Sequence, residues 1–385
     1  MVVIACFDGS ESESQQGNLV LIRSLLAKAG LILCLTIASA VATCAIAGPV
    51  GELHRTAFDP TASLRDAAQR DQLRITIWYP AATDAKEQEL LIGPPGKALF
   101  DVGSVAPQAA FSSDADRHPV LLLSHGFGGT ARVMGWFGIA MARDGYIVVA
   151  VDHPGNNAVD KMTVAGAILW WDRTEDLRIA LAAIKQDPVI GPHLDLSRLG
   201  VAGFSAGGFT ALVASGARVD IARFIHFCEV NPSDSVCGPQ EEFVVTKQDA
   251  LDLFKRPEIA AEAVHASDDH SIPQVRATFV MAPAIVQALD PDSLAHMHVP
   301  VEIMLGDKDH IASPTTNGFV AAKAIPGAIL KQLPGVGHDD FLAECTDLGR
   351  ATLARCKTQV PQADTHRQAI QAATTFFDRA LNATN

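Results

Sequence analysis

Short apolar runs alternate with helical patterns along most of the chain, and this alternation restricts the fold more than any other feature. The apolar runs are 73–79, 120–124, 147–152, 199–204, 277–281, 301–305 and 329–333. Several are continuous blocks of Val, Ile and Leu, which is typical of strands buried on both faces of a sheet. Helical patterns occupy 131–144, 170–185, 206–217, 317–324 and, near the end, 365–381. This order predicts an α/β fold with a mostly parallel central sheet and helices on both faces.

The alternation is interrupted once, between residues 215 and 272. This segment holds two cysteines, a polar turn at 231–234 and one helical pattern at 247–265. A long insertion in a regular α/β chain is often a lid or a binding element. We therefore expect one domain over residues 48–385, with a helical lid inserted at about 216–272. The acidic cluster 268–270 in this insertion is either a metal site or a solvated loop, and general residue statistics favour the loop.

The first 47 residues have the features of a secretory signal. Arg23 and Lys28 precede an apolar run, 29–47, that ends in small residues. This order predicts cleavage after Ala47 and export to the periplasm or the medium. The alternative is an uncleaved membrane anchor, because the run is just long enough to span the hydrocarbon core. Membrane contact is expected only through this segment.

Four of the seven cysteines follow residue 47, and they form two close pairs. Cys228 and Cys237 are 9 residues apart, and Cys345 and Cys356 are 11 apart. Neither pair has the spacing of a zinc knuckle. In an exported chain, an even number of cysteines predicts two local disulfides, whereas retention in the cytosol would leave four buried thiols.

The charge balance argues against nucleic acid as a partner. The 385 residues include 43 Asp and Glu against 30 Lys and Arg, for a formal charge of −13, and no basic run offsets this average. Such a surface repels phosphate backbones.

The residues around Ser205 carry the strongest chemical signal. An apolar run ends at Phe204, the sequence GFSAG occupies 203–207, and a helical pattern follows. A serine in a sharp turn between strand and helix needs small residues two positions before and after it, and Gly203 and Gly207 meet that need. The amides at the start of the helix can stabilise an anion that develops beside the serine. This pattern predicts that Ser205 is a nucleophile.

A serine nucleophile needs a base, and the base needs an orienting acid. His338 follows the run 329–333, and Asp309 follows the run 301–305. The order Ser205, Asp309, His338 places all three after strands at one edge of the sheet. Asp307 is the alternative acid, but tight turns often use Asp to bond their own backbone, which favours Asp309.

The glycine-rich segment 124–129 (SHGFGG) is suited to hold an oxyanion. We expect the donors to be the backbone amides of Phe127 and Ala206. His125 is expected to bond this turn rather than to transfer protons. His153, Trp170 and Trp171 are candidate substrate-binding residues, because His153 follows a strand at the edge where ligands bind and the tryptophans open a helix nearby. No metal or organic cofactor is required.

These residues resemble those of the α/β-hydrolase superfamily, and more narrowly a group similar to predicted dienelactone hydrolases and platelet-activating-factor acetylhydrolases. The resemblance spans about 74–341 and rests on segments 78–80, 124–129, 151–155 and 203–208 and on His338. Dienelactone hydrolases use a cysteine where this chain has Ser205, so their substrate does not carry over. In the acetylhydrolases the acid follows an earlier strand, but the matching stretch 281–284 (MAPA) has no carboxylate. That difference favours Asp309.

The residues and the resemblance together predict an exported serine hydrolase that cleaves a small-molecule carboxylic ester through an acyl-enzyme. Two alternatives stay open. The same residues could cleave an amide, a lactam or a polyester, because these reactions differ in the pocket and the leaving group rather than in the triad. The chain could also be a binding protein of the cell envelope that keeps a hydrolase fold.

Overall fold

A computed structural model of the chain describes residues 48–382, so the predicted signal segment 1–47 lies outside the described residues. The strands are β1 (Val50–Phe58), β2 (Gln72–Pro80), β3 (Gln88–Ile92), β4 (Phe100–Pro107), β5 (His118–Ser124), β6 (Ile147–Asp152), β7 (Leu194–Phe204), β8 (Val275–Met281), β9 (Val301–Gly306), β10 (Ile329–Leu333) and β11 (Glu344–Cys345). The helices are α1 (Ala62–Arg65), α2 (Gly135–Arg143), α3 (Val164–Ile168), α4 (Asp172–Gln186), α5 (Ala206–Ala214), α6 (Ile221–Val230), α7 (Lys247–Leu253), α8 (Pro257–Ala263), α9 (Pro291–Ala295), α10 (Gly318–Ala324), α11 (Asp347–Thr352) and α12 (Gln362–Leu381).

In residues 48–382, eleven strands form one sheet in the order β10-β9-β8-β7-β5-β6-β2-β1-β4-β11, with β3 paired to β4. The six strands from β10 to β6 are mutually parallel. β2 pairs antiparallel with both β6 and β1. The carboxyl ends of the parallel strands therefore meet at one edge, where the loops after β5, β7, β9 and β10 come together.

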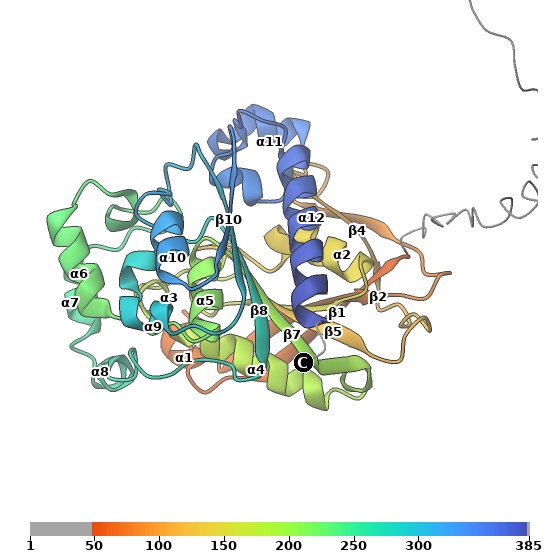
Figure 1. The fold of residues 1–385 in the computed structure, drawn as a ribbon, viewed down its shortest axis with the longest axis horizontal. Helices are drawn as coiled ribbons and strands as arrows, with labels where there is room; N and C mark the ends of the chain where they lie inside the picture. The colour runs from red at the N-terminus through yellow and green to blue at the C-terminus, as the bar shows by residue number, and fades with distance from the viewer. Residues whose placement is uncertain (1–47, 383–385) are drawn as a thin grey trace, which may run out of the picture. The chain divides into compact units, whose positions relative to one another are not determined.

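Helices cover both faces of this sheet, as Figure 1 shows. Along β5, Val120 and Leu122 belong to the core layer that includes residues of α4 and α5. Their neighbours Leu121 and Leu123 belong to the opposite layer, with α2 and α12. Successive strand side chains point to opposite faces, so a continuous apolar run fills both layers. The fold-class prediction is confirmed.

Four strands were not expected from the sequence: β1, β3, β4 and β11. All four lie at the end of the sheet beyond β2. β1 carries Glu52, His54 and Arg55, so its apolar positions do not form a continuous run. A half-exposed strand of this kind gives a weak pattern.

The insertion between α5 and β8 is helical, but its helices are shorter than expected. The pattern at 247–265 divides into α7 and α8, because Pro257 starts a new helix and holds Arg256 in an extended conformation. α6, α7 and α8 lie together at the left of Figure 1, beside the sheet. None of the helices in residues 48–382 is long and apolar enough to cross a membrane.

Candidate active site

Ser205 occupies the sharp turn that joins β7 to α5. Its backbone angles, φ 56° and ψ −121°, lie outside the regions that L-residues prefer. The two flanking glycines permit this turn. A Cβ at Gly203 would lie 2.0 Å from the Gly207 carbonyl oxygen, and a Cβ at Gly207 would lie 2.0 Å from the Ser124 carbonyl oxygen. Only glycine allows such close approach of strand, helix and neighbouring loop.

The structure brings His338 and Asp309 into line with Ser205. His338 Nε2 lies 2.9 Å from Ser205 Oγ, and His338 Nδ1 lies 2.7 Å from Asp309 Oδ2. Asp309 follows β9, and His338 lies between β10 and the turn Asp339–Phe341. Asp309 must act as the acceptor, so Nδ1 carries the ring proton and Nε2 is free to accept the proton of Ser205.

Asp307, the alternative acid, has other partners. Its Oδ1 accepts a hydrogen bond of 2.6 Å from the Gly335 amide, and its carboxylate lies 3.6 Å from Lys308 Nζ. Asp307 therefore bonds the backbone of the neighbouring loop, as tight-turn aspartates do. Asp309 is the carboxylate that meets His338.

The environment of His338 favours its charged form. Burial disfavours the imidazolium, but the charge and hydrogen bond of Asp309 outweigh burial, with further contributions from Asp339 and Glu242. The pKa of His338 is therefore raised above its ordinary value of 6.5. An imidazole with this pKa can take up a proton when the serine is deprotonated.

The two predicted oxyanion donors come from two different segments near Ser205. Ala206 is the first residue of α5, and Phe127 lies in the loop after β5. Among residues 48–382, neither the Phe127 amide nor the Ala206 amide donates a hydrogen bond to the protein. The loop passes close to the serine, because a Cβ at Gly126 would lie 3.3 Å from Ser205 Cβ. Both amides are thus free to bind an anion.

His125 is part of the loop structure, as expected. It is 1% exposed, its Nδ1 lies 2.7 Å from the Gly126 carbonyl oxygen, and its Nε2 accepts a hydrogen bond from the His153 amide. Burial and the nearby His153 and Arg173 lower its pKa well below the ordinary value. A neutral, enclosed imidazole of this kind holds the turn and cannot reach a substrate.

A pocket of about 570 Å³ adjoins Ser205 and His338. Its apolar lining includes side chains from β3, β4, β7 and several loops, among them Leu91, Ile92, Phe100, Phe127, Val133, Phe204, Ile311 and Leu342. Its charged lining consists of Arg132, Glu241, Glu242, Asp339 and Arg355. The part of the insertion that lines it is the segment from Ser235 to Glu242.

Both predicted disulfide pairs are joined in the structure, and each lies next to this pocket. Cys228 bonds Cys237, which precedes the lining residues Pro239 to Glu242. Cys345 bonds Cys356, which follows the lining residue Arg355. Arg355 Nη2 lies 3.2 Å from Glu242 Oε1, so an ion pair joins the two segments that the disulfides hold. Glu242 and Arg355 were not predicted from the sequence as pocket residues, although each lies within a few residues of a paired cysteine.

His153, Trp170 and Trp171 are not among the residues that line this pocket, so the pocket gives no support to the prediction that they bind substrate. His153 and Trp171 are 0% exposed. His153 turns inward, with Nδ1 2.7 Å from Asp176 Oδ2 and Nε2 2.8 Å from Ser124 Oγ. Trp170 packs edge-on against Phe209 and Phe224.

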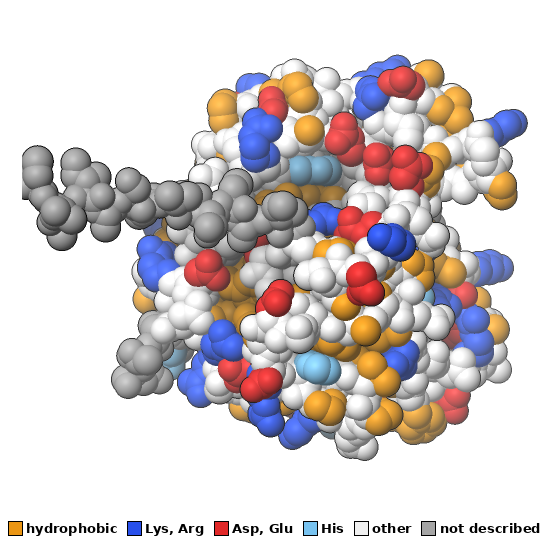
Figure 2. All heavy atoms as spheres, turned by 90° about the vertical axis from the view of Figure 1, so that its right-hand side faces the viewer, with side chains coloured by type: hydrophobic (Ala, Val, Ile, Leu, Met, Phe, Trp, Pro, Cys, Tyr) orange, Lys and Arg blue, Asp and Glu red, His pale blue; other side chains and the backbone are white. Residues whose placement is uncertain are grey.

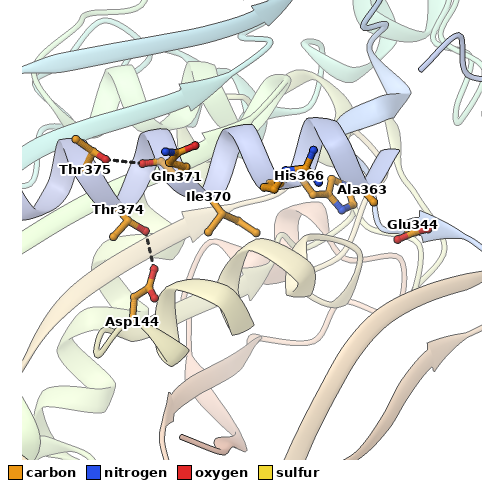
Figure 3. A pocket seen from close by; sticks show the side chains of 9 residues that line it. Asp144, Glu344, Ala363, His366, Ile370, Gln371, Thr374 and Thr375 are labelled. Atoms are coloured by element: carbon orange, nitrogen blue, oxygen red, sulfur yellow. Dashed lines mark hydrogen bonds between the residues drawn. The ribbon is translucent and has the colours of Figure 1, made fainter. Parts of the chain in front are cut away.

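A second hollow runs along α12 and is shallow. Figure 3 shows its lining side chains, among them Thr374, which donates a hydrogen bond of 2.6 Å to Asp144. His366 in this hollow stacks on Trp136 and bonds the Leu342 carbonyl, so its ring supports the packing of α12. The hollow contains no member of the Ser205 group.

The acidic cluster 268–270 is a surface loop. His265 Nδ1 lies 2.8 Å from Asp268, and Asp269 pairs with Arg218. Within residues 48–382, no three or more His, Cys, Asp or Glu side chains are grouped so that they could hold a metal ion. The face drawn in Figure 2 carries acidic and basic side chains interspersed, with no continuous basic patch visible on it.

Comparisons with known proteins agree with this architecture. Residues 101–187 match the family described as platelet-activating factor acetylhydrolase, isoform II. A ferulic acid esterase from Streptomyces cinnamoneus superimposes with a TM-score of 0.56 and 20% sequence identity, over 87% of this chain and 91% of that one.

A puromycin-hydrolyzing peptidase from Mycobacterium tuberculosis is more distant, with a TM-score of 0.47 and 13% identity, over 86% of this chain and 39% of that one. No curated protein sequence matches the chain significantly. The family match spans β4 to α4, which includes the loop of Phe127 but not Ser205, Asp309 or His338. The chain therefore has the α/β-hydrolase fold, and its segment from β4 to α4 resembles the platelet-activating factor acetylhydrolases.

Proposed function

We propose that this protein is a serine hydrolase that cleaves carboxylic esters through an acyl-enzyme. The observation that carries the proposal is the unbroken hydrogen-bonded line from Ser205 through His338 to Asp309, at 2.9 Å and 2.7 Å. The strained backbone of Ser205 supports it further, because strain of this kind persists where the surrounding structure enforces it and clusters at functional sites.

In the proposed reaction, Ser205 Oγ attacks the ester carbonyl carbon while His338 Nε2 takes the hydroxyl proton. The amides of Phe127 and Ala206 bind the oxygen that becomes negative in the tetrahedral intermediate. The bond to the leaving oxygen then breaks, and His338 gives its proton to the departing alcohol. Water repeats the sequence on the acyl-enzyme and releases the acid.

The pocket supports esters of modest size with an apolar group. A volume of about 570 Å³ is in the range of small-molecule sites, and side chains such as Ile92, Phe100 and Leu342 supply an apolar surface. The names of the Streptomyces structure and of the matched family both describe ester-cleaving enzymes, which agrees with this proposal. The phospholipid substrate of the acetylhydrolases is not carried over, because the match omits the residues of the proposed triad.

We further propose that the protein works in an oxidising compartment, after export. The disulfides Cys228–Cys237 and Cys345–Cys356 support this, because disulfides persist in secreted and periplasmic proteins and are rare in the cytosol.

A panel of p-nitrophenyl esters from acetate to palmitate, with anilides and lactams of matched acyl size, tests the proposal. We expect ester turnover that falls with long acyl chains, and no turnover in a folded Ser205→Ala variant. Turnover that survives Ser205→Ala would contradict the mechanism. Faster cleavage of the anilide or lactam than of the matched ester would contradict the substrate class.

A further inference from the structure

Arg173 is a buried cation that the proposed mechanism does not use. It is the second residue of α4 and is 1% exposed. It does not line the pocket, so it cannot touch a substrate bound there. A charge enclosed to this degree is costly unless hydrogen bonds and opposite charges compensate it.

The guanidinium of Arg173 joins the two segments that carry the proposed oxyanion amides. Its Nη2 donates to the carbonyl oxygen of His125, two residues before Phe127. Its Nε donates to Thr210 Oγ1 at 3.0 Å, and the Thr210 hydroxyl donates to the Ala206 carbonyl oxygen, also at 3.0 Å. One rigid fork therefore bonds the loop of Phe127 and the first turn of α5 together.

A fully buried hydrogen-bond network holds Arg173 in turn. Nη2 also donates to Ser124 Oγ at 3.3 Å, and Ser124 donates to His153 Nε2 at 2.8 Å. His153 Nδ1 donates to Asp176, which also accepts from Arg65 at 2.7 Å. Ser124, His153 and Asp176 are all 0% exposed, so this second Ser-His-Asp arrangement cannot meet a substrate.

The protonation states in this network are consistent. Burial and the positive charges of Arg173 and Arg65 lower the pKa of His153 well below its usual value. Burial also lowers the pKa of Arg173, to about 9, although Asp176 opposes this. Arg173 is thus charged and His153 neutral near pH 7, and each hydrogen bond in the chain has one donor and one acceptor.

We propose that Arg173 is a positioning residue for the oxyanion hole: it fixes the Phe127 amide relative to the Ala206 amide. The inference rests on the proposed function of the Ser205 site. Both amides must lie near 2.7–3.1 Å from the oxyanion to stabilise it. A small change in their separation therefore weakens the binding of the transition state more than the binding of the substrate.

Two variants test the inference with little change in volume. Arg173→Lys keeps the charge but loses the fork, and Thr210→Val removes the hydroxyl that relays it to Ala206. Thr174→Val is the matched control: Thr174 is also 0% exposed, lies beside Arg173 in α4, and its hydroxyl has no partner among residues 48–382.

The measurements are kcat and KM on p-nitrophenyl butyrate, the inhibition constant of a trifluoromethyl ketone and the melting temperature. Ser205 adds to the carbonyl of the ketone and forms an oxyanion, so the affinity for the ketone measures how well the oxyanion hole binds. Removing a single oxyanion donor lowers kcat about 100-fold to 1,000-fold, so misplacing one should lower it about 10-fold to 100-fold. We expect Arg173→Lys and Thr210→Val to lower the affinity for the ketone by the same factor, with little change in KM or in the acidic limb of the pH profile.

An unchanged ketone affinity would overturn the inference. So would a loss of kcat explained by the unfolded fraction, or an equal loss in Thr174→Val. An inactive wild-type enzyme would overturn the proposed function and this inference with it. An active wild type with a fully active Arg173→Lys would overturn only the role of Arg173.

Discussion

Replacing Asp309 with Asn is expected to remove most of the activity, because it moves the ring proton of His338 to the wrong nitrogen. In the wild type, Asp309 Oδ1 accepts hydrogen bonds from the amides of Ile311 and Ala312, at 2.9 Å and 2.7 Å. Oδ2 accepts the bond from His338 Nδ1. In Asp309→Asn, the amide oxygen stays with the two backbone donors, and the amide nitrogen faces His338.

The alternative orientation of that amide would leave two backbone donors facing an NH2 group, at a cost of about 1–3 kcal/mol each. His338 Nδ1 must therefore become an acceptor, and the ring proton moves to Nε2. Nε2 then faces Ser205 as a donor and cannot take its proton. The same tautomer error in another Ser-His-Asp enzyme lowers kcat about 10⁴-fold, or about 5 kcal/mol. We expect a loss of about 10³-fold to 10⁴-fold here.

Asp307→Asn is the matched control, because Asp307 bonds Gly335 and does not contact His338. Its kcat on p-nitrophenyl butyrate should stay close to that of the wild type, and thermal unfolding should show that both variants fold. The reasoning would be refuted if Asp309→Asn kept more than about a tenth of the wild-type kcat, given the size of the tautomer effect. A comparable loss in Asp307→Asn would refute the choice of acid.

Three further predictions concern the turn at Ser205, the pKa of His338 and the buried His366. Gly207→Ala should yield little folded protein, because its Cβ would lie 2.0 Å from the Ser124 carbonyl oxygen. In the control Gly238→Ala the nearest atom is 3.7 Å away, so this variant should melt like the wild type. Equal melting temperatures for the two variants would contradict this prediction. Asp339→Asn should move the acidic limb of kcat/KM to lower pH, because the charge of Asp339 helps to raise the pKa of His338, and a limb that stays or rises would count against that electrostatic account. Burial lowers the pKa of His366 to about 4 from 6.5, so the unfolded chain binds its proton first and stability is lost as pH falls through this window. His366→Phe keeps the stacking on Trp136. Between pH 6.5 and pH 4, its free energy of unfolding in urea titrations should therefore fall by about 3 kcal/mol less than that of the wild type. Parallel pH curves for the two proteins would contradict the assignment.

The parallel half of the sheet and the residues of the proposed triad could be predicted because their signals are local. A strand buried on both faces is a continuous apolar run, and the turn at Ser205 demands glycine on both sides. β1 and β4 could not be predicted in this way. They lie in the part of the sheet beyond β2, where charged residues such as Glu52 and Asp101 interrupt the pattern.

The burial of His153 shows that a loop position in the sequence does not determine where a side chain points. His153 follows a strand at the ligand edge, yet Asp176 draws its ring into the core. Conversely, the pocket lining includes Glu242 and Arg355, which lie 113 residues apart in the chain and meet only in the folded protein. A single sequence contains no local pattern for such a meeting.

The most direct test of the central claim is mass spectrometry of the folded protein after reaction with a fluorophosphonate. Such a probe bonds a serine only when a neighbouring base and an oxyanion hole activate it. We expect one adduct, mapped to the peptide that contains Ser205, and none in Ser205→Ala. An adduct on another residue, or none in a folded protein that hydrolyses esters, would contradict it.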